Sequence, residues 1–438
     1  DSDGVPLLQA SATIIDYKTG QVKVLIGGRG NQPSASLNRA YFDLKSIGST
    51  TKPLTVYGPA IDTKLITAGT PLDDTSVSEE ILEKYNFGSV VPKNADGSMF
   101  GYITAREALT YSKNLTSIKT VDMLGLDTAL NYGKKAGLKY APQSHTMSAL
   151  ALGQFDQPIG NRDGGNTTIL ASAYGAFGNN GVIYEPALYT KVEDASGNLL
   201  LEKEPISTKL FSPQTSYIIY DILKGSSTSA QFNDIPVAGK TGTTNSSDNF
   251  WFAGLTPYYS GSVWIGYDNP QRMNGKSSSA ASLFSKIMAV AHEGLEYKDI
   301  EKPSGLVEAK VCKDSGKSPT DLCYEDQRGN RVKTEYFIDG TQPKSVCDIH
   351  VSVSVNSSNN KLANKNTPSR LIEDKVFINK PNANPNADDY PFVVPTREDD
   401  TKAEEYIKLS EIGLRADMDL YDAIVILNNR GIKYKIHG

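Results

Sequence analysis

The sequence predicts an α+β fold in which helices flank a central antiparallel sheet, with an all-α subdomain and a C-terminal appendage. Residues 12–17 and 22–27 alternate like two strands joined by a tight turn. Residues 237–267 are rich in Phe, Trp, Tyr and Val, and a Thr-Pro turn divides them into hairpin arms. Apolar residues recur at helical spacing over 104–138. Strand patterns and helix patterns therefore occupy separate runs of the chain.

Individual helices can be placed from their boundary signals. A helix is expected to begin at Ser49, because Pro53 would fall in its first turn, where a missing N–H group costs nothing. The pattern over 104–138 predicts two helices separated by a break near Ser112-Lys113-Asn114. A further helix is expected over 168–177 and should end at the Gly-Asn-Asn-Gly that follows.

Length and composition exclude several classes of protein. A chain of 438 residues is long enough for two or three domains, and its 39% hydrophobic content contains no apolar run that could span a bilayer. The formal net charge of -5 argues against a general nucleic-acid surface, which needs an excess of Lys and Arg. The first residue is Asp1 and no signal peptide is present, so the chain is expected to be a trimmed piece of a longer protein.

Three short motifs carry the candidate chemistry. In chain order they are Ser49-Thr50-Thr51-Lys52, Ser112-Lys113-Asn114 and Lys240-Thr241-Gly242-Thr243, which match Ser-x-x-Lys, Ser-x-Asn and Lys-Thr-Gly. Each motif by itself is weak evidence for a catalytic site, because the chain contains other copies of it in segments that are predicted to be loops. These copies are Ser358-Asn359-Asn360-Lys361, Lys18-Thr19-Gly20 and Ser247-Asp248-Asn249. The order of the three motifs and their settings, at a helix start, at a helix break and in a strand, favour the first set.

The spacing of the first motif suits nucleophilic catalysis. Residues three apart on a helix share a face, so Lys52 would lie beside Ser49 and could take the hydroxyl proton if its pKa were lowered. Ser49 is the predicted nucleophile and Lys52 the predicted general base. The backbone N–H groups of Ser49 and Thr243 are the predicted oxyanion hole.

The other two motifs would handle the substrate. We expect Ser112 to relay a proton to the leaving amine and Asn114 to hydrogen-bond a substrate amide. Lys240, together with Thr241 and Thr243, would hold a terminal carboxylate. Gly242 would let the substrate backbone approach the strand closely.

These residues resemble the penicillin-binding transpeptidase family, and more narrowly its class A, bifunctional branch. The resemblance extends over roughly residues 8–290. It includes Asp16-Tyr17-Lys18-Thr19-Gly20, Gly48-Ser49-Thr50-Thr51-Lys52-Pro53, Ala173-Tyr174-Gly175-Ala176-Phe177, Trp251-Phe252-Ala253-Gly254 and Val263-Trp264-Ile265-Gly266-Tyr267. A further similar segment follows it, around Glu335-Tyr336-Phe337-Ile338.

The resemblance implies a fold, an activity and a location. The fold would be that of penicillin-binding proteins and serine β-lactamases, and the enzyme would be a serine D,D-transpeptidase that cross-links peptidoglycan. Its partners would be stem peptides ending in D-Ala-D-Ala, an amine acceptor and other cell-wall synthesis proteins, and β-lactams would acylate Ser49. The full protein would be membrane-anchored at the extracytoplasmic face and would carry an N-terminal glycosyltransferase domain.

Changes in composition suggest the domain limits. Residues 1–300 would form the transpeptidase domain and 301–350 a cysteine-containing extension. Residues 351–388 are expected to be a polar linker, and 389–438 a small C-terminal element of unknown role. Within that element, a helical pattern lies around 402–412 and a strand-like pattern at 431–436.

The cysteines leave two readings open. Cys312 and Cys323 are eleven positions apart, which favours a local disulfide or buried thiols over a zinc pair. With Cys347 and His350 they could still form a Cys3His zinc site. We expect no metal and no cofactor, and metal analysis of protein purified without chelator would test this.

Other functions share the same motifs. A D,D-carboxypeptidase or a serine β-lactamase would release the acyl group to water, but no Glu-x-x-Leu-Asn segment of the kind that positions a deacylating water is present. A β-lactam sensor or a non-catalytic cell-wall scaffold would keep the fold without cross-linking. Motifs alone do not exclude the sensor or the scaffold.

Overall fold

The computed structural model describes residues 4–155, 163–401 and 409–436. Its contacts divide the chain into two compact units. The first consists of Asp1–Thr320, Arg331–Cys347 and Ala383–Tyr390, and the second of Asp321–Asn330, Asp348–Asn382 and Pro391–Gly438. The chain therefore crosses between the units several times.

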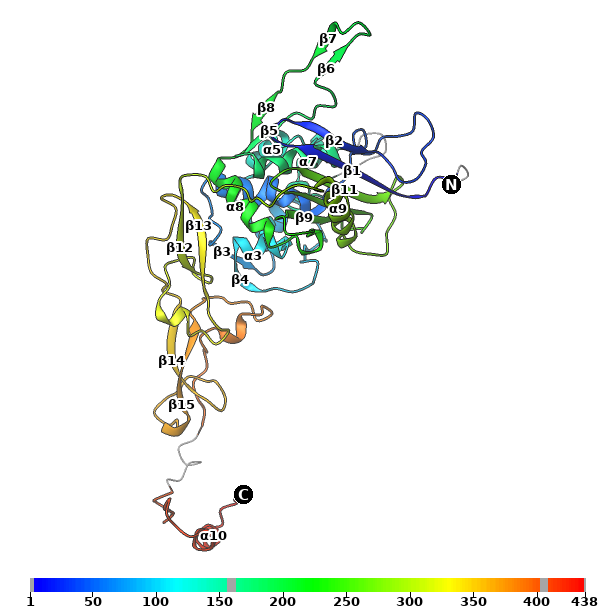
Figure 1. Cartoon of the computed structure of the whole chain (residues 1–438). Coiled ribbons are helices and arrows are strands. Elements are labelled where there is room, and N and C mark those ends of the chain that lie inside the picture. Colours follow the sequence, from blue (N-terminus) through cyan, green and yellow to red (C-terminus); the bar gives the residue numbers. More distant parts are fainter. Residues whose placement is uncertain (1–3, 156–162, 402–408, 437–438) are drawn as a thin grey trace. The chain divides into compact units, whose positions relative to one another are not determined.

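A five-stranded antiparallel sheet forms the centre of the first unit (Figure 1). Its strand order is β2-β1-β11-β10-β9. The strands are β1 (Leu8–Asp16), β2 (Gln21–Ile26), β9 (Ala238–Thr243), β10 (Asn249–Leu255) and β11 (Ser260–Tyr267). Strand β1 pairs with β11, which brings the start of the chain beside residues more than 240 positions later. This confirms the predicted antiparallel sheet and both of its hairpins.

Helices cover both faces of this sheet. Every residue of β10 is buried, and alternate side chains enter different apolar clusters because successive residues of a strand point to opposite faces. Trp251 belongs to the cluster that contains Tyr174 of α7 (Thr167–Gly175). Phe252 belongs to the cluster that contains Phe284 of α9 (Ser278–Ala291). The sheet is thus the middle layer between helices, as the α+β prediction requires.

Further helices lie in the first unit, and those between residues 53 and 152 include the predicted all-α part. They are η1 (Gly48–Thr51), η2 (Pro53–Tyr57), α1 (Gly58–Asp62), α2 (Glu79–Lys84), α3 (Ala105–Thr110), α4 (Asn114–Leu124), α5 (Leu126–Lys135), η3 (Pro142–Ser144), α6 (Met147–Leu152), η4 (Ala176–Gly178), α8 (Pro213–Lys224) and η5 (Thr228–Ala230). The predicted break at 112–114 is confirmed. A second break at Gly125 was missed, where a φ of +87° suits glycine and interrupts the helix.

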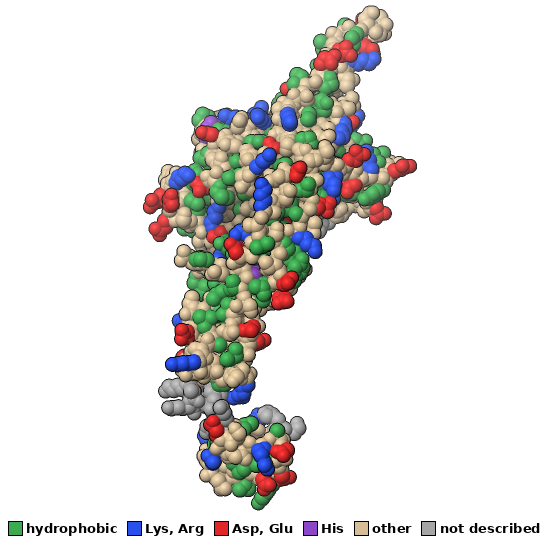
Figure 2. Space-filling model, turned by 90° about the vertical axis from the view of Figure 1, so that its left-hand side faces the viewer, with side chains coloured by type: hydrophobic (Ala, Val, Ile, Leu, Met, Phe, Trp, Pro, Cys, Tyr) green, Lys and Arg blue, Asp and Glu red, His purple; other side chains and the backbone are tan. Residues whose placement is uncertain are grey.

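Short strand pairs complete the first unit. They are β3 (Pro71–Asp74) with β4 (Gly101–Thr104), β5 (Val182–Tyr184) with β8 (Ser207–Lys209), β6 (Lys191–Glu193) with β7 (Leu199–Glu202), and β12 (Leu306–Cys312) with β13 (Val332–Ile338). On the face shown in Figure 2, basic and acidic side chains are interspersed. Among the described residues, no helix combines the length and apolar character needed to cross a membrane.

Residues 351–388 correct the sequence prediction of a polar linker. Within the second unit, β14 (His350–Asn356) pairs antiparallel with β15 (Ile372–Ile378). The segment Val351-Ser352-Val353-Ser354-Val355 alternates with the period of a strand, but its serines gave it the composition of a linker. Val355 is fully buried, and so is Ile378. The two strands therefore have an apolar side to bury.

Two predictions concern the C-terminal element, a helix around 402–412 and a strand at 431–436. The helical pattern at 402–412 lies largely outside the described residues. The strand-like pattern at 431–436 was wrong, because these residues form a turn and irregular backbone. The structure instead has a helix, α10 (Leu420–Asn429), whose first turn is capped by the Asp419 side chain accepting from the Tyr421 N–H group.

The cysteines form no disulfide in the described structure. In the first unit, the Sγ atoms of Cys312 and Cys347 lie 3.7 Å apart, well beyond the length of an S–S bond, about 2.05 Å. All three cysteines are buried without a disulfide, so of the two readings for Cys312 and Cys323 the structure has the buried thiols, and the zinc alternative stays an untested hypothesis.

A buried ion pair fastens the β12–β13 hairpin to α3. The Arg106 guanidinium on α3 lies 2.6 Å from the Glu335 carboxylate on β13, whose side chain is fully buried. Arg106 also pairs with Asp221 on α8 at 2.7 Å. Because α3 leads directly into Ser112, this pair helps to fix the segment that presents the second motif.

Replacing Arg106 with Ala is expected to lower the free energy of unfolding of the first unit by about 3–5 kcal/mol, because Glu335 would keep a buried charge without its partner. Lys302→Ala is the matched control. Lys302 lies just before the same hairpin and pairs with Glu308 on β12, but both side chains are about half exposed. Urea unfolding followed by tryptophan fluorescence measures both, as Trp251 and Trp264 are buried in this unit. Equal losses in the two variants would contradict the assignment.

Candidate active site

The three motifs meet at one cavity of about 470 Å³. Ser49 reaches it from η1, Ser112 and Asn114 from the start of α4, and Thr241 and Thr243 from β9. These elements are far apart in the sequence, so only the fold brings them together. Lys52 and Lys240 are buried, with 0% and 2% of their surface exposed.

Ser49 lies at the start of a helical segment, as predicted, and the first turn of this segment is a 3-10 helix. Side chains three residues apart eclipse one another in a 3-10 helix, which keeps Ser49 and Lys52 on one face. Gly48 has a φ of +55°, and a Cβ atom there would lie 2.5 Å from the carbonyl oxygen of Thr243. The glycine therefore allows the Ser49 turn to pack directly against β9. Because this turn has only four residues, its helix macrodipole is small. Any oxyanion hole must therefore depend on hydrogen bonds from the individual backbone N–H groups.

The Lys52 amine connects the first motif to the second. Its Nζ atom donates to the carbonyl oxygens of Ser112 at 2.6 Å and Lys113 at 3.1 Å, and to Asn114 Oδ1 at 2.8 Å. Burial lowers the pKa of Lys52 well below that of an ordinary lysine, and the positive charge of Lys240 lowers it further. The amine is thus held in place and is easier to deprotonate, which a general base requires.

Lys240 is the second buried amine of the site. Burial lowers its pKa to about 8. Its Nζ atom donates to the Thr241 carbonyl oxygen at 3.4 Å. Lys240 is 2% exposed and is not among the described residues that line the cavity, so it would act on a ligand mainly through its charge.

Gly242 has a packing role that the sequence analysis did not predict. A Cβ atom at this position would lie 2.4 Å from the Ile47 carbonyl oxygen and 2.9 Å from Thr50 Cγ2. The residue is buried, so the glycine makes room for the turn that carries Ser49, and close approach of a substrate backbone stays a prediction. A ligand would meet Thr241 and Thr243, because alternate residues of a strand face the same side.

The other motif copies lie elsewhere, with one exception. Lys18 and Thr19 form the turn between β1 and β2, and Ser358 belongs to the second unit, where its hydroxyl donates to Asn356 Oδ1. Ser247 lies in the turn between β9 and β10, as expected, but it also lines the cavity. Sequence reasoning did not foresee this contribution to the cavity wall.

Sequence analysis also missed part of the wall. The segment 93–96, between β3 and β4, and Gln154 both line the cavity. Within the second motif, Lys113 is 1% exposed and forms ion pairs with Asp74 and Asp96. One signal was available in the sequence, since a lysine directly before a helix cannot accept the free N–H groups and another residue must do so.

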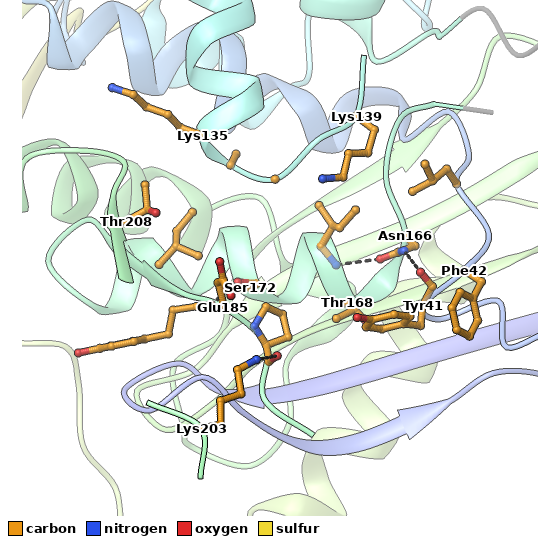
Figure 3. A pocket seen from close by; sticks show the side chains of 17 residues that line it. Tyr41, Phe42, Lys135, Lys139, Asn166, Thr168, Ser172, Glu185, Lys203 and Thr208 are labelled. Atoms are coloured by element: carbon orange, nitrogen blue, oxygen red, sulfur yellow. Dashed lines mark hydrogen bonds between the residues drawn. The ribbon is translucent and has the colours of Figure 1, made fainter. Parts of the chain in front are cut away.

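A second cavity, of about 550 Å³, contains none of the predicted site residues (Figure 3). Tyr41 and Phe42 lie at one end of it, and Lys135, Lys139 and Lys203 are among its lining residues. The Asn166 side chain donates to the Tyr41 carbonyl oxygen at 2.6 Å and accepts from the Ile169 N–H group, which begins α7. Asn166 therefore has a structural role there, and the chemistry-bearing motifs belong to the smaller cavity.

Comparisons with known proteins agree with the motifs. Residues 10–289 match the penicillin-binding protein transpeptidase domain, and residues 302–352 match the penicillin-binding protein 1A C-terminal domain. Penicillin-binding protein 1A of Clostridium perfringens is 52% identical over 377 residues, which are 83% of this chain and 45% of that protein. The corresponding protein of Clostridium botulinum is 44% identical over 86% of this chain and 46% of its own length. The chain thus spans less than half of these relatives.

Solved structures agree on the fold. Penicillin-binding protein 1A of Haemophilus influenzae has a TM-score of 0.65 at 21% identity and covers 78% of this chain and 55% of its own. The PonA1 protein of Mycobacterium tuberculosis, solved in complex with penicillin V, has a TM-score of 0.57 at 21% identity, covering 69% and 83% of the two chains.

Gly242→Ala is expected to lower the free energy of unfolding by about 1–3 kcal/mol, because the new methyl group would press on the Ile47 backbone, which cannot move aside freely. Gly225→Ala is the matched control, since the nearest atom to its Cβ would lie 3.3 Å away and its φ is -72°. Thermal unfolding distinguishes the two. A Gly242→Ala protein as stable as Gly225→Ala would show that the turn and β9 are not in close contact.

Proposed function

The chain belongs to the penicillin-binding protein transpeptidase family, and we propose that it is a serine D,D-transpeptidase that cross-links peptidoglycan stem peptides through an acyl-enzyme at Ser49. The observation that carries this proposal is the buried Lys52 amine, which lies in the motif of the nucleophile and hydrogen-bonds the motif of the proton relay. The donor would be a peptide ending in D-Ala-D-Ala, and β-lactams would acylate the same serine.

Acylation begins with proton transfer. In the proposed reaction, Lys52 Nζ takes the Ser49 hydroxyl proton as Ser49 Oγ attacks the carbonyl carbon of the penultimate D-Ala. The resulting oxyanion accepts from the backbone N–H groups of Ser49 and Thr243. The tetrahedral intermediate then collapses to an ester, the peptide C–N bond breaks, and the terminal D-Ala leaves as an amine after receiving a proton through Ser112.

The second half reverses these roles. The amine of a neighbouring stem peptide attacks the ester, loses a proton to the Lys52 and Ser112 pair, and forms the new peptide bond. The ester C–O bond breaks, and Ser49 regains its hydroxyl proton. Atoms and charges balance without a cofactor, and one peptide bond replaces another.

Substrate binding would use the rest of the cavity. The terminal carboxylate of the donor would accept hydrogen bonds from Thr241 and Thr243, which line the cavity. The buried Lys240 ammonium on the same strand would attract the carboxylate through its charge. Asn114 Oδ1 already accepts from Lys52, and its Nδ2 donates to the Lys93 carbonyl oxygen at 2.9 Å. An amide nitrogen has two hydrogens to donate, so one remains for a substrate carbonyl group.

The setting of the full protein is also a proposal. We infer that it works at the extracytoplasmic face of a bacterial membrane, anchored by a segment outside this chain, and that it acts with other cell-wall synthesis proteins. The curated relatives suggest this, since they are penicillin-binding proteins roughly twice as long as this chain.

Incubation with a penicillin is expected to add one drug mass to the wild-type chain, and the adduct should persist for longer than the time of measurement. Ser49→Ala should show no adduct, because it lacks the nucleophile. Ser247→Ala is the matched control, since this serine lines the same cavity and should not be acylated. Intact-protein mass spectrometry gives the result directly.

The lifetime of the adduct, together with an assay on a model peptide, separates the alternative functions. Rapid loss of the adduct with hydrolysed drug would indicate a β-lactamase. A lasting adduct, together with release of D-Ala from a model peptide but no transfer to an added amine, would indicate a carboxypeptidase, and no activity on the peptide at all would indicate a sensor. An adduct retained in Ser49→Ala would refute the assignment of the nucleophile.

The rate constant for acylation is expected to depend on pH with two limbs. It should rise as the pH increases through the lowered pKa of Lys52, because the amine accepts a proton only when neutral. It should fall as the pH passes about 8, because Lys240 then loses the charge that binds the carboxylate. The two amines interact, so both limbs describe the pair.

Lys240→Arg is the control, since a guanidinium stays protonated over this range. The high-pH limb should disappear in this variant while the low-pH limb remains. Stopped-flow measurements with a fluorescent penicillin between pH 5 and pH 10 would show both limbs. A high-pH limb unchanged in Lys240→Arg would exclude Lys240 as its source.

A further inference from the structure

We propose that Asn94 is a positioning residue for this reaction, because it caps α4 from a separate segment and fixes the strained turn that presents Ser112. The inference rests on the proposed function and names a residue outside the three motifs. Asn94 lies between β3 and β4, in the wall of the cavity, and its side chain is 5% exposed.

The turn at Ser112 needs support. Ser112 has a φ of +60°, in the left-handed region that residues other than glycine rarely occupy. A glycine would adopt this backbone without strain but would lack the hydroxyl group of the proton relay. The surrounding structure must therefore hold a serine in a conformation that it would otherwise leave.

The start of α4 also lacks a cap of its own. Lys113 occupies the N-cap position, and no side-chain hydrogen bond is made from there, since an ammonium group cannot accept one. Asn94 Oδ1 accepts from the backbone N–H groups of Asn114 at 2.7 Å and Leu115 at 3.2 Å. A distant asparagine thus does what a capping residue normally does within its own helix.

The other end of the Asn94 amide is fixed as well. Its Nδ2 atom donates to Asp74 Oδ1 at 2.7 Å and to the Ser98 carbonyl oxygen at 2.7 Å. Asp74 is fully buried and accepts from the Phe100 N–H group through its second oxygen. Both polar atoms of the amide are therefore used twice, and the side chain has one favourable orientation.

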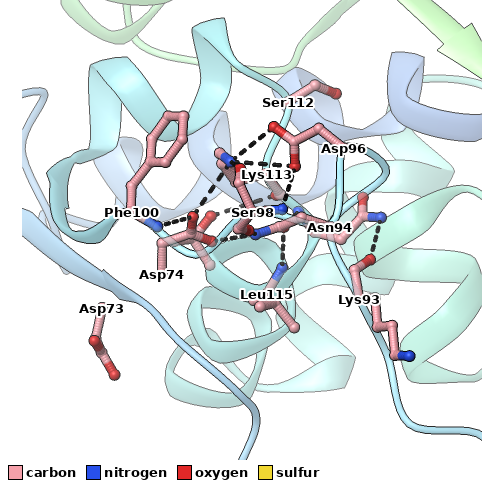
Figure 4. A network of polar contacts seen from close by, with 12 residues as sticks. Asp73, Asp74, Lys93, Asn94, Asp96, Ser98, Phe100, Ser112, Lys113 and Leu115 are labelled. Carbon is pink, nitrogen blue, oxygen red and sulfur yellow. Dashed lines mark hydrogen bonds and ion pairs between the residues drawn. The ribbon is translucent and has the colours of Figure 1, made fainter. Parts of the chain in front are cut away.

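Lys113 closes the network from the side of the motif (Figure 4). Its ammonium donates to Ser98 Oγ at 2.6 Å and pairs with Asp96 at 3.0 Å and Asp74 at 3.5 Å. It also lies 3.5 Å from the centre of the Phe100 ring. The residue between Ser112 and Asn114 is thus anchored to the same segment that caps the helix.

This anchoring reaches the catalytic amine. The carbonyl oxygens of Ser112 and Lys113 both accept from Lys52 Nζ. A shift of the turn would move these acceptors and Asn114 Oδ1 together, and with them the amine that takes the Ser49 proton. Small displacements of catalytic groups reduce rates strongly while leaving the fold intact.

The test separates non-covalent binding of a fluorescent penicillin from the acylation rate constant. Asn94→Ala is expected to lower the rate constant at least tenfold, with the binding constant changed less than threefold and a circular dichroism spectrum like that of the wild type. Val91→Ala is the matched control, because this residue of the same segment is 54% exposed and is not among the described residues that line the cavity. It should acylate at the wild-type rate.

A second pair of variants covers a failure of Asn94→Ala to fold. Asn94→Asp removes the donor that faces Asp74 and should lower the rate constant. The double variant Asn94→Asp/Asp74→Asn restores a donor and an acceptor between the two positions with the number of carboxylates unchanged. It does not restore the hydrogen bond to the Ser98 carbonyl oxygen, so it should recover part of the rate.

The outcomes are distinguishable. Wild-type protein that penicillin does not acylate would refute the proposed function itself. If the wild type is acylated, then a wild-type rate constant in Asn94→Ala or Asn94→Asp, or a double variant no better than Asn94→Asp, would overturn the positioning role and leave the function standing.

Discussion

The Lys52 amine is buried where the 48–57 helical segment, the start of α4 and strand β9 meet, and the arrangement of the site depends on it. A buried amine needs acceptors, and here they are carbonyl and amide oxygens rather than a paired carboxylate. These acceptors hold the group without stabilising its charge as strongly as a salt bridge would. Gly48 and Gly242 allow the backbone approach that brings the Ser49 turn against β9.

Charge is distributed unevenly around this point. Lys52, Lys113 and Lys240 are among the largest fully buried side chains, and Asp74 is the buried carboxylate beside Lys113. Like charges lower the pKa of a neighbouring amine, so Lys240 and Lys113 both favour the neutral form of Lys52, while Asp74 opposes it. In the proposed reaction, this excess of positive charge would suit a substrate that carries a terminal carboxylate, and the same groups would serve both binding and proton transfer.

Support for the second motif comes from two directions. Arg106 on α3 is held by the β13 carboxylate of Glu335, just before Ser112, and the segment around Asn94 holds the residues just after it. The region matched to the penicillin-binding protein 1A C-terminal domain therefore contributes, through β13, to the scaffold behind the motif. A strained backbone at Ser112 persists because its neighbours on both sides are fixed.

The sequence by itself determined the α+β class, the main strands and helices, the break at Ser112 and the three motifs, because periodicity, turn residues and motif spacing are local properties. It did not determine the β14–β15 pair, because alternating Val and Ser residues in a polar segment have the composition of a linker. It also did not determine the packing role of Gly242, because what a glycine accommodates depends on which segment packs against it. Only the tertiary structure decided that Asn94 caps α4 and that Lys52 contacts the second motif. These contacts join residues 20 or more positions apart, and no local pattern records which distant acceptor a buried donor will find.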